Sequence, residues 1–407
     1  MAAVGAAVVV VAAACGSSSS GGVSKAGKTG TQNYTVGILT DLTGPGASSS
    51  KTAPKGFEAG VGLAAQKGYT IKYVVADTGS SPAGALTAAQ KLVTRNHVFA
   101  VMALSGLTFA ASAYLTAHHI PVVGAAIDST EWITSSNMFS VTGTQDFNKV
   151  ISTYGLVFKK IGVTNLGTIG YGAVPGSSSA AKGAAISAKS AGVKVGYLNP
   201  QFPLFSTDVG PIALAMKDAR VDGLITSVQT NVAFGLITAL RQQGVNLKGA
   251  LLPTGYGGDL TQGGPGAVQS AQGVYFLSAL EPVEMHTAAT ERFTKALSTF
   301  AGVTSQPTFA EYLAYASIDA FVTGLKAAGS HPSQSSFINA MLKIKNYNAD
   351  GLYGSHSIGF SMSQRGQSAG ADNCFWLTRF AGSSFHLVAG ADPICGTVLP
   401  GKTVSGS

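Results

Sequence analysis

The chain has 407 residues, of which 45% are hydrophobic and only 11% are charged, and its three cysteines exclude a disulfide scaffold. That length suffices for two or three domains with their own cores, and beyond the N-terminus no run of about 18 uncharged apolar residues predicts a membrane-spanning helix. The 26 Lys and Arg residues exceed the 18 Asp and Glu residues and give a net charge of +8, but they are scattered, without the basic and aromatic stripe of a nucleic-acid-binding surface.

The N-terminus has the features of an export signal. Residues 1–14 carry no charge and form an Ala/Val run too short to span a bilayer, which is typical of the apolar core of a signal peptide. Three alanines precede Cys15, and small residues directly before a cysteine resemble the bacterial lipobox. The resemblance implies that Cys15 becomes the first mature residue and carries diacylglycerol, which anchors the protein to the outer face of the cell membrane through this lipid only. A buried Ala-rich helix is the alternative, and the basic residue expected ahead of the apolar run is missing.

Residues 15–33 are rich in Ser and Gly and predict a flexible tether. Within them, residues 22–29 (GVSKAGKT) match the phosphate-loop pattern, whose backbone amides hold phosphates between a strand and a helix. Serines precede the pattern and a polar stretch follows it, so neither flanking element is predicted. We therefore expect neither nucleotide binding nor any other cofactor.

From residue 34 onward, short apolar runs alternate with amphipathic segments. Strands are predicted at 34–39, 71–76, 98–104 and 121–126, with helices at 54–66, 85–94 and 110–118. The pattern then repeats, with strands at 166–171, 193–197, 222–227 and 249–253 and helices at 179–191, 211–218 and 232–242. Continuous apolar strands separated by helices indicate parallel sheets covered on both faces. The predicted fold class is α/β, with two doubly wound lobes whose ligand lies outside the carboxyl ends of the strands.

Several short motifs resemble those of one family in order and spacing. They are residues 34–45 (YTVGILTDLTGP), Asp77 followed by 83–93, residues 120–123 (IPVV), residues 205–208 (FSTD) and residues 315–320 (YASIDA). Together they resemble the Leu/Ile/Val-binding-like family, the type I solute-binding proteins of bacterial ABC importers. The resemblance covers about residues 34 to 390, nearly the whole mature chain.

The resemblance implies a clamshell whose chain crosses between the lobes three times, near 139–144, 276–282 and 350–353. Lobe 1 is then 34–141 plus 282–350, and lobe 2 is 142–281 plus 351–400. A small-molecule solute would stabilise the closed form, which would dock on a permease and its ATPases. We expect a monomer that is not an enzyme; an extracytoplasmic ligand sensor built on the same clamshell is the alternative.

The loop after the third strand is the first candidate site. Ser105, Gly106, Leu107 and Thr108 open the next helix, where backbone amides and two hydroxyls can hold a carboxylate or carbonyl oxygen. The resemblance implies the same role, since the family's loop amides and serine hold the ligand carboxylate here. An ordinary helix cap by Ser or Thr is the alternative.

The loop after the fourth strand should face the same cleft. Amino-acid binders of the family commonly carry a hydroxyl residue here, whereas this chain has Ala126, Ile127 and Asp128. In the cleft, Asp128 would repel an anion and favour a cation or a hydrogen-bond donor. Alternatively, Asp128 caps the following helix.

The second lobe contributes Tyr171 and Gln229 at the ends of strands, and Tyr256 in the sequence TGYGG. Amino-acid binders usually place a carboxylate near Tyr256 for the ligand ammonium, and none precedes Asp259 here. These tyrosines favour a flatter or more apolar solute, such as an aromatic or aliphatic acid or an amide, although they are equally compatible with rim positions. Phe309 completes the candidate ligand-binding residues.

No His-Glu-x-x-His or spaced Cys/His set predicts a metal site, and no Gly-x-Ser-x-Gly predicts a hydrolase nucleophile. Cys374 and Cys395 flank the last predicted strands, 375–380 and 385–388. Export permits disulfides, so these two cysteines are expected to pair once Cys15 is acylated.

Overall fold

The computed structural model describes residues 32–125, 130–388, 390 and 392–405. They belong to the second of two units into which the chain divides, Thr31–Ser407. The predicted signal peptide, Cys15 and nearly all of the predicted tether lie outside the described residues. Within the part of the chain that the structure describes, no helix has the length and apolar character needed to cross a membrane.

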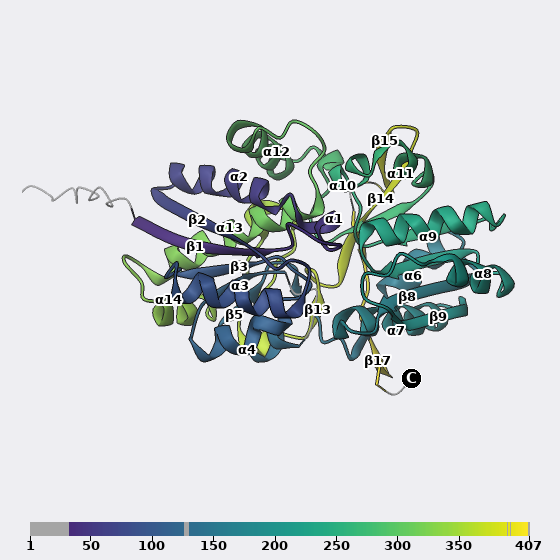
Figure 1. The fold of residues 1–407 in the computed structure, drawn as a ribbon, viewed down its shortest axis with the longest axis horizontal. Coiled ribbons are helices and arrows are strands. Elements are labelled where there is room, and N and C mark those ends of the chain that lie inside the picture. Colours follow the sequence, from purple (N-terminus) through teal and green to yellow (C-terminus); the bar gives the residue numbers. More distant parts are fainter. Residues whose placement is uncertain (1–31, 126–129, 389, 391, 406–407) are drawn as a thin grey trace, which may run out of the picture. The chain divides into compact units, whose positions relative to one another are not determined.

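The first lobe is built on a five-stranded, fully parallel sheet with the strand order β2-β1-β3-β4-β5 (Figure 1). Its strands are β1 (Gln32–Thr40), β2 (Tyr69–Asp77), β3 (Ala100–Ala103), β4 (Val122–Gly124) and β5 (Met138–Ser140). Its helices are α1 (Ala47–Ser50), α2 (Ala53–Gln66), α3 (Pro82–Thr94), α4 (Phe109–Ala117), α5 (Glu131–Thr134), α12 (Ala288–Ala301), α13 (Phe309–Ala328) and α14 (Gln334–Met341).

Side-chain alternation along β1 divides the core of this lobe between the two faces of the sheet. Val36 and Ile38 are buried in the cluster that contains Phe57 of α2 and Phe321 of α13, whereas Leu39 joins the cluster of α3 and α4. Because both faces are covered by helices, the strands are apolar throughout, as the sequence pattern predicts.

The second lobe repeats this topology. Its sheet has the order β15-β14-β12-β11-β10-β8-β9, and β16 pairs with β14. The strands are β8 (Asn165–Tyr171), β9 (Lys194–Phe202), β10 (Gly223–Ser227), β11 (Gly249–Leu252), β12 (Tyr275–Ser278), β14 (Cys374–Ala381), β15 (Ser384–Val388) and β16 (Ile394–Cys395). The helices are α6 (Thr153–Lys160), α7 (Pro175–Ser190), α8 (Gly210–Asp218), α9 (Thr230–Gln242), α10 (Gly258–Gln262) and α11 (Gly264–Ser270).

Strands β8, β9, β10, β11 and β12 run parallel to one another, and β14 and β15 extend the sheet in the antiparallel sense. The strand order of the parallel part, β9-β8-β10-β11-β12, matches that of the first lobe. The predicted fold class, two doubly wound α/β lobes, is confirmed.

The chain passes between the lobes at three places. After β5 it forms β6 (Gly143–Thr144), which pairs with β13 (Ser368–Ala369), and β7 (Lys149–Ile151), which pairs with β17 (Val398–Thr403). After β12 it returns through the short helix η1 (Val283–Met285). Two further single turns, η2 (Ala349–Gly351) and η3 (Met362–Gln364), precede the last passage.

The third passage lies later in the chain than the expected 350–353. Tyr347 bridges to Ile358, and the Phe360 amide donates to the carbonyl of Ile344. Arg365 donates to the carbonyls of Trp132 and Ser135 at 3.1 and 2.6 Å, so this segment is still bonded to the first lobe. The crossing therefore falls at β13, because the buried guanidinium finds its acceptors beside β5.

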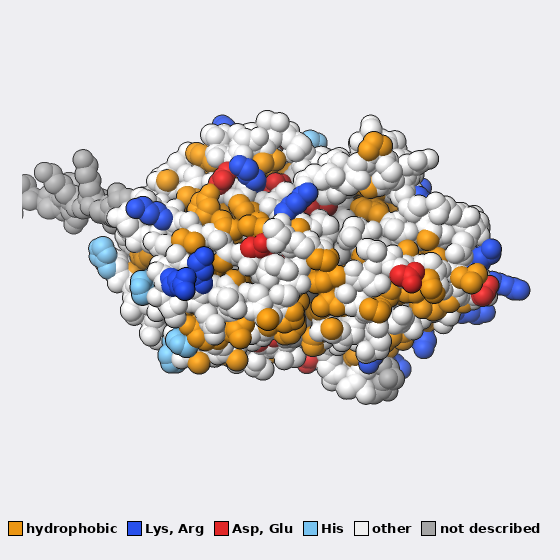
Figure 2. Space-filling view, viewed as in Figure 1, with side chains coloured by type: hydrophobic (Ala, Val, Ile, Leu, Met, Phe, Trp, Pro, Cys, Tyr) orange, Lys and Arg blue, Asp and Glu red, His pale blue; other side chains and the backbone are white. Residues whose placement is uncertain are grey.

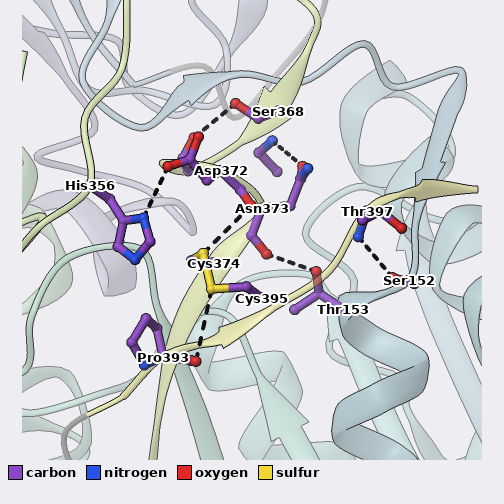
Figure 3. The surroundings of a disulfide bond; sticks show 12 residues. Ser152, Thr153, His356, Ser368, Asp372, Asn373, Cys374, Pro393, Cys395 and Thr397 are labelled. Carbon is purple, nitrogen blue, oxygen red and sulfur yellow. Dashed lines mark hydrogen bonds and ion pairs between the residues drawn. A yellow bond between two sulfur atoms is a disulfide. The ribbon is translucent and has the colours of Figure 1, made fainter. Parts of the chain in front are cut away.

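A disulfide between Cys374 and Cys395 joins β14 to β16 (Figure 3). Around it, Thr153 donates to the carbonyl of Asn373 at 2.8 Å, and Asp372 lies 3.0 Å from Nδ1 of His356. The disulfide thus links two C-terminal strands to each other. The two contacts connect the residues just before β14 to α6 and to the segment that precedes β13.

Candidate ligand-binding site

A cavity of about 300 Å³ lies where the carboxyl ends of strands from both sheets meet. Residues that directly follow β1, β3, β10, β11 and β12, or end β8, line it: Asp41, Leu104, Val228, Gln229, Pro253, Ala279 and Tyr171. Gly143 and Gly370, from the paired segments of the crossing, also line it. This is the position that the topology of doubly wound sheets predicts, and the volume suits a small solute.

Aromatic side chains form much of the cavity wall. Tyr171 stacks on Phe202 with ring centroids 6.0 Å apart and meets Phe205 edge-on at 5.9 Å. Phe309 begins α13 on the first-lobe side, and Tyr154 and Phe375 stack at 6.1 Å on the second-lobe side. The wall thus offers flat apolar surfaces from both lobes.

The backbone of Phe205, a residue of this wall, is strained. Its backbone has a φ of 58°, in the left-handed region that residues other than glycine seldom adopt. Strain of this kind is concentrated at functional sites, where the surrounding structure enforces it.

Polar groups of the second lobe also reach the cavity. The Tyr171 hydroxyl accepts a hydrogen bond from the Gln229 amide at 3.2 Å, and burial raises the pKa of Tyr171 to about 12. Ser177 accepts from the Tyr171 amide at 2.7 Å. Within the described residues, Oε1 of Gln229 and Oγ1 of Thr254 are buried without hydrogen-bond partners. A solute in the cavity could satisfy these two atoms.

The loop expected to hold a carboxylate is hydrogen-bonded to itself. Ser105 is buried and donates to Asp41 Oδ1 at 2.6 Å, while its own Oγ accepts from the Leu107 amide at 3.1 Å. The Thr108 hydroxyl donates to the Ser105 carbonyl at 2.7 Å, and the Thr108 amide donates to the same oxygen. Gly106 and Leu107 line the cavity, but Ser105 and Thr108 do not. Both hydroxyls are thus engaged within the turn, and the predicted carboxylate contact at this loop stays a prediction.

Asp41, which directly follows β1, was not among the sequence-based candidates. It lines the cavity with only 1% of its surface exposed, and its Oδ1 accepts from the hydroxyls of Ser105 and Thr78. Burial raises the pKa of Asp41, and the bonds from Ser105 and Thr78 lower it. Its position at the carboxyl end of the first strand was the available signal.

Tyr256 does not line the cavity. Its hydroxyl donates to Oε2 of Glu284 and accepts from the Val283 amide, and its ring lies 6.2 Å from that of Tyr312. Burial raises the pKa of Tyr256 well above its usual value. The side chain is thus placed between β11 and the start of the second crossing, because its hydroxyl has two partners there.

The remaining predicted residues divide between the cavity and the undescribed segment. Tyr171, Gln229 and Phe309 line the cavity, whereas Ala126, Ile127 and Asp128 lie outside the described residues. Asp41 is the sole charged side chain among the described residues that line the cavity. On the face shown in Figure 2, basic side chains form small separate groups without a continuous stripe.

Two doubly wound lobes with a cavity at the facing strand ends define a solute-binding clamshell. A family model for periplasmic binding proteins matches residues 33–384, and the chain belongs to this family. A search of curated protein sequences finds no match.

Solved structures share the fold at low sequence identity. A solute-binding protein of an ABC transporter from R. palustris, in complex with 4-hydroxybenzoate, is 18% identical with a TM-score of 0.72 over 90% of this chain and 98% of that chain. A second one from R. palustris, in complex with benzoate, is 16% identical with a TM-score of 0.73 over 90% and 98%. A leucine-binding protein from Thermotoga maritima is 15% identical with a TM-score of 0.71 over 89% and 99%.

Proposed function

We propose that the protein is an extracytoplasmic solute-binding protein of an ABC importer. It captures a small organic solute, which is amino-acid-like, an aromatic or aliphatic acid, or an amide, and delivers it to a permease and its ATPases without converting it. The observation that carries the proposal is the cavity between the lobes at the carboxyl ends of both sheets. Family membership supports the same role.

The wall of the cavity supports a flat or apolar body for the solute. Tyr171, Phe205 and Phe309 present ring surface from both lobes, and two relatives in fold are complexes with benzoate and 4-hydroxybenzoate. The buried, unpartnered oxygens of Gln229 and Thr254 would orient such a solute by hydrogen bonds.

Anchoring at the membrane is part of the proposal. The apolar run before Cys15 supports export and lipidation, and the tether would let the clamshell reach a permease. Cells that express a Cys15→Ser variant should release the protein from the membrane fraction, and full retention of that variant would contradict lipid anchoring.

A thermal-shift screen tests solute binding. Amino acids, aromatic acids, short fatty acids and amides are added to the protein, and a solute present at 100 times its Kd should stabilise it by about 2.7 kcal/mol. Phe205→Ala should weaken binding of any hit at least tenfold, because it removes one cavity wall. Leu214→Ala, at an exposed position on α8, is the control. Failure of every compound, or chemical conversion of a hit, would contradict the proposal.

A further inference from the structure

The first-lobe wall presents a hydrogen-bond acceptor at the place where a site for anions was expected. The Ser105 hydroxyl donates to Asp41, and the Thr108 hydroxyl donates to the Ser105 carbonyl. The amides of Leu107 and Thr108 donate to the hydroxyl and the carbonyl oxygen of Ser105. Among the polar groups with which this wall lines the cavity is the Asp41 carboxyl group, which is almost wholly buried. A solute bound beside Asp41 therefore contacts the oxygen atoms of a hydrogen-bond acceptor.

The two oxygens of this carboxyl group differ in their partners. Oδ1 accepts two hydrogen bonds, from Ser105 and Thr78. Oδ2 accepts none from the residues that the structure describes. A donor on the solute could bond to this oxygen.

Asp41 has no basic partner in the described lining of the cavity. Among the described residues that line the cavity there is no Lys, Arg or His, so a solute carboxylate would lack a counter-ion. It would also be repelled by Asp41, because like charges a few ångströms apart in a poorly solvated site interact strongly. Burial raises the pKa of Asp41, whereas the bonds from Ser105 and Thr78 favour its charged form, in which both oxygens are acceptors.

We propose that Asp41 is the polar anchor of the cavity and that the solute carries an N–H donor, as an ammonium or an amide, on a compact apolar body. This inference rests on the proposed function and narrows its solute class by excluding free carboxylic acids. The apolar body lies against the rings of Tyr171, Phe205 and Phe309, and Oε1 of Gln229 offers a second acceptor.

Matched triads of solutes test the inference. Each triad keeps one apolar body and changes its head group, as in benzoate, benzamide and benzylamine, or isovalerate, isovaleramide and isoamylamine. Titration calorimetry on the mature chain, from residue 15 onward, should give an amine or amide a Kd at least tenfold below that of the matching acid. The amide and amine arms distinguish a neutral donor from a cation.

The variant Asp41→Asn removes the negative charge but keeps one acceptor oxygen. It should reduce the preference for the best binder over its matching acid at least tenfold, because repulsion of the acid is lost. Asp218→Asn is the control, since Asp218 is exposed at the end of α8 and does not line the cavity. If Asp41→Asn fails to fold, the head-group ranking of the wild-type protein decides the question.

Two results would overturn the inference while leaving the proposed function intact: an acid that binds more tightly than its amide and amine, or an unchanged preference in Asp41→Asn. Absence of binding by every triad member to correctly folded protein would overturn the inference, and failure of the whole thermal-shift screen would in addition overturn the proposed function.

Discussion

At the scale of single residues, burial is the main cause of the raised pKa values of the acids Asp41 and Asp259. Asp259 in α10 is 8% exposed, and its Oδ2 accepts from the Phe309 amide at 3.2 Å. Burial raises its pKa to about 8; the Phe309 bond lowers it, and the charge of Glu311 raises it. Asp259 therefore joins the second lobe to the N-terminus of α13 in a protonation state that depends on pH.

The pKa of Asp259 predicts a specific pH dependence of stability. Because the pKa of about 8 lies above the usual value of 3.8, the folded protein keeps a proton that the unfolded chain releases. The contribution of this proton to the free energy of unfolding is fully present below about pH 4. It is lost as the pH rises toward 8, by up to about 1.4 kcal/mol per pH unit. In urea unfolding from pH 5 to 8, the stability of wild type relative to Asp259→Asn should fall steadily.

Asp208→Asn, at an exposed position, is the control for this measurement and should leave the slope of wild type unchanged. Other acids with raised pKa values, such as Asp319 at about 6, are present in both proteins and cancel in the difference. A difference between wild type and Asp259→Asn that stays constant with pH would show that Asp259 titrates normally.

At the scale of elements, close packing of α2 against α13 depends on a glycine. A Cβ added at Gly56 would lie 2.3 Å from the carbonyl oxygen of Glu311 and 2.7 Å from its Cα. These are backbone atoms of a long buried helix, so they cannot move without shifting α13. Glycine is required here by the approach of the two backbones.

Gly56→Ala should therefore destabilise the protein by about 1–3 kcal/mol, the usual cost of overpacking. Gly183→Ala in α7 is matched to it, because its added Cβ would meet only Val404 at 3.8 Å. There the gain in helix propensity should dominate and stabilise by about 0.5–1 kcal/mol. Chemical unfolding of both variants measures the two signs, and equal effects would contradict the packing argument.

At the scale of the whole described unit, contacts between α1 and α9 hold the two lobes together beside the cavity. Ser49 and Thr230 bond through their hydroxyls at 3.1 Å, and Ser48 donates to Asn231 at 3.2 Å. Since these residues come from different lobes, the bonds form only when the lobes approach. We therefore expect them to contribute to a closed state of the two lobes, which a bound solute would also stabilise.

Asn231→Ala removes one of these bonds at a residue that does not line the cavity. An exposed hydrogen bond contributes about 0.5–1 kcal/mol, so solute affinity should fall about two- to fivefold through the closing equilibrium. Calorimetry measures the affinity, and small-angle scattering should show a more open solute-free protein. Asn339→Ala on α14 is the control, and an equal loss of affinity there would exclude a role in closure.

Much of this molecule is determined by local patterns in the sequence. Apolar runs such as 34–39 and 166–171 become β1 and β8 because a strand buried on both faces must be apolar throughout. The helices between the strands follow from their amphipathic period, and their alternation implies the parallel sheets and the edge where the cavity lies. Tyr171 and Gln229 reach the cavity from the strand ends that this alternation selects.

The tertiary structure alone decides which polar groups at that edge remain available to a solute. Ser105 bonds to Asp41, 64 residues earlier, and Tyr256 to Glu284, 28 residues later, and no local pattern encodes either pair. The late third crossing depends likewise on Arg365 reaching carbonyls more than 200 residues away. Strand period is a local property, whereas hydrogen-bond satisfaction in a buried site depends on which loops the fold brings together.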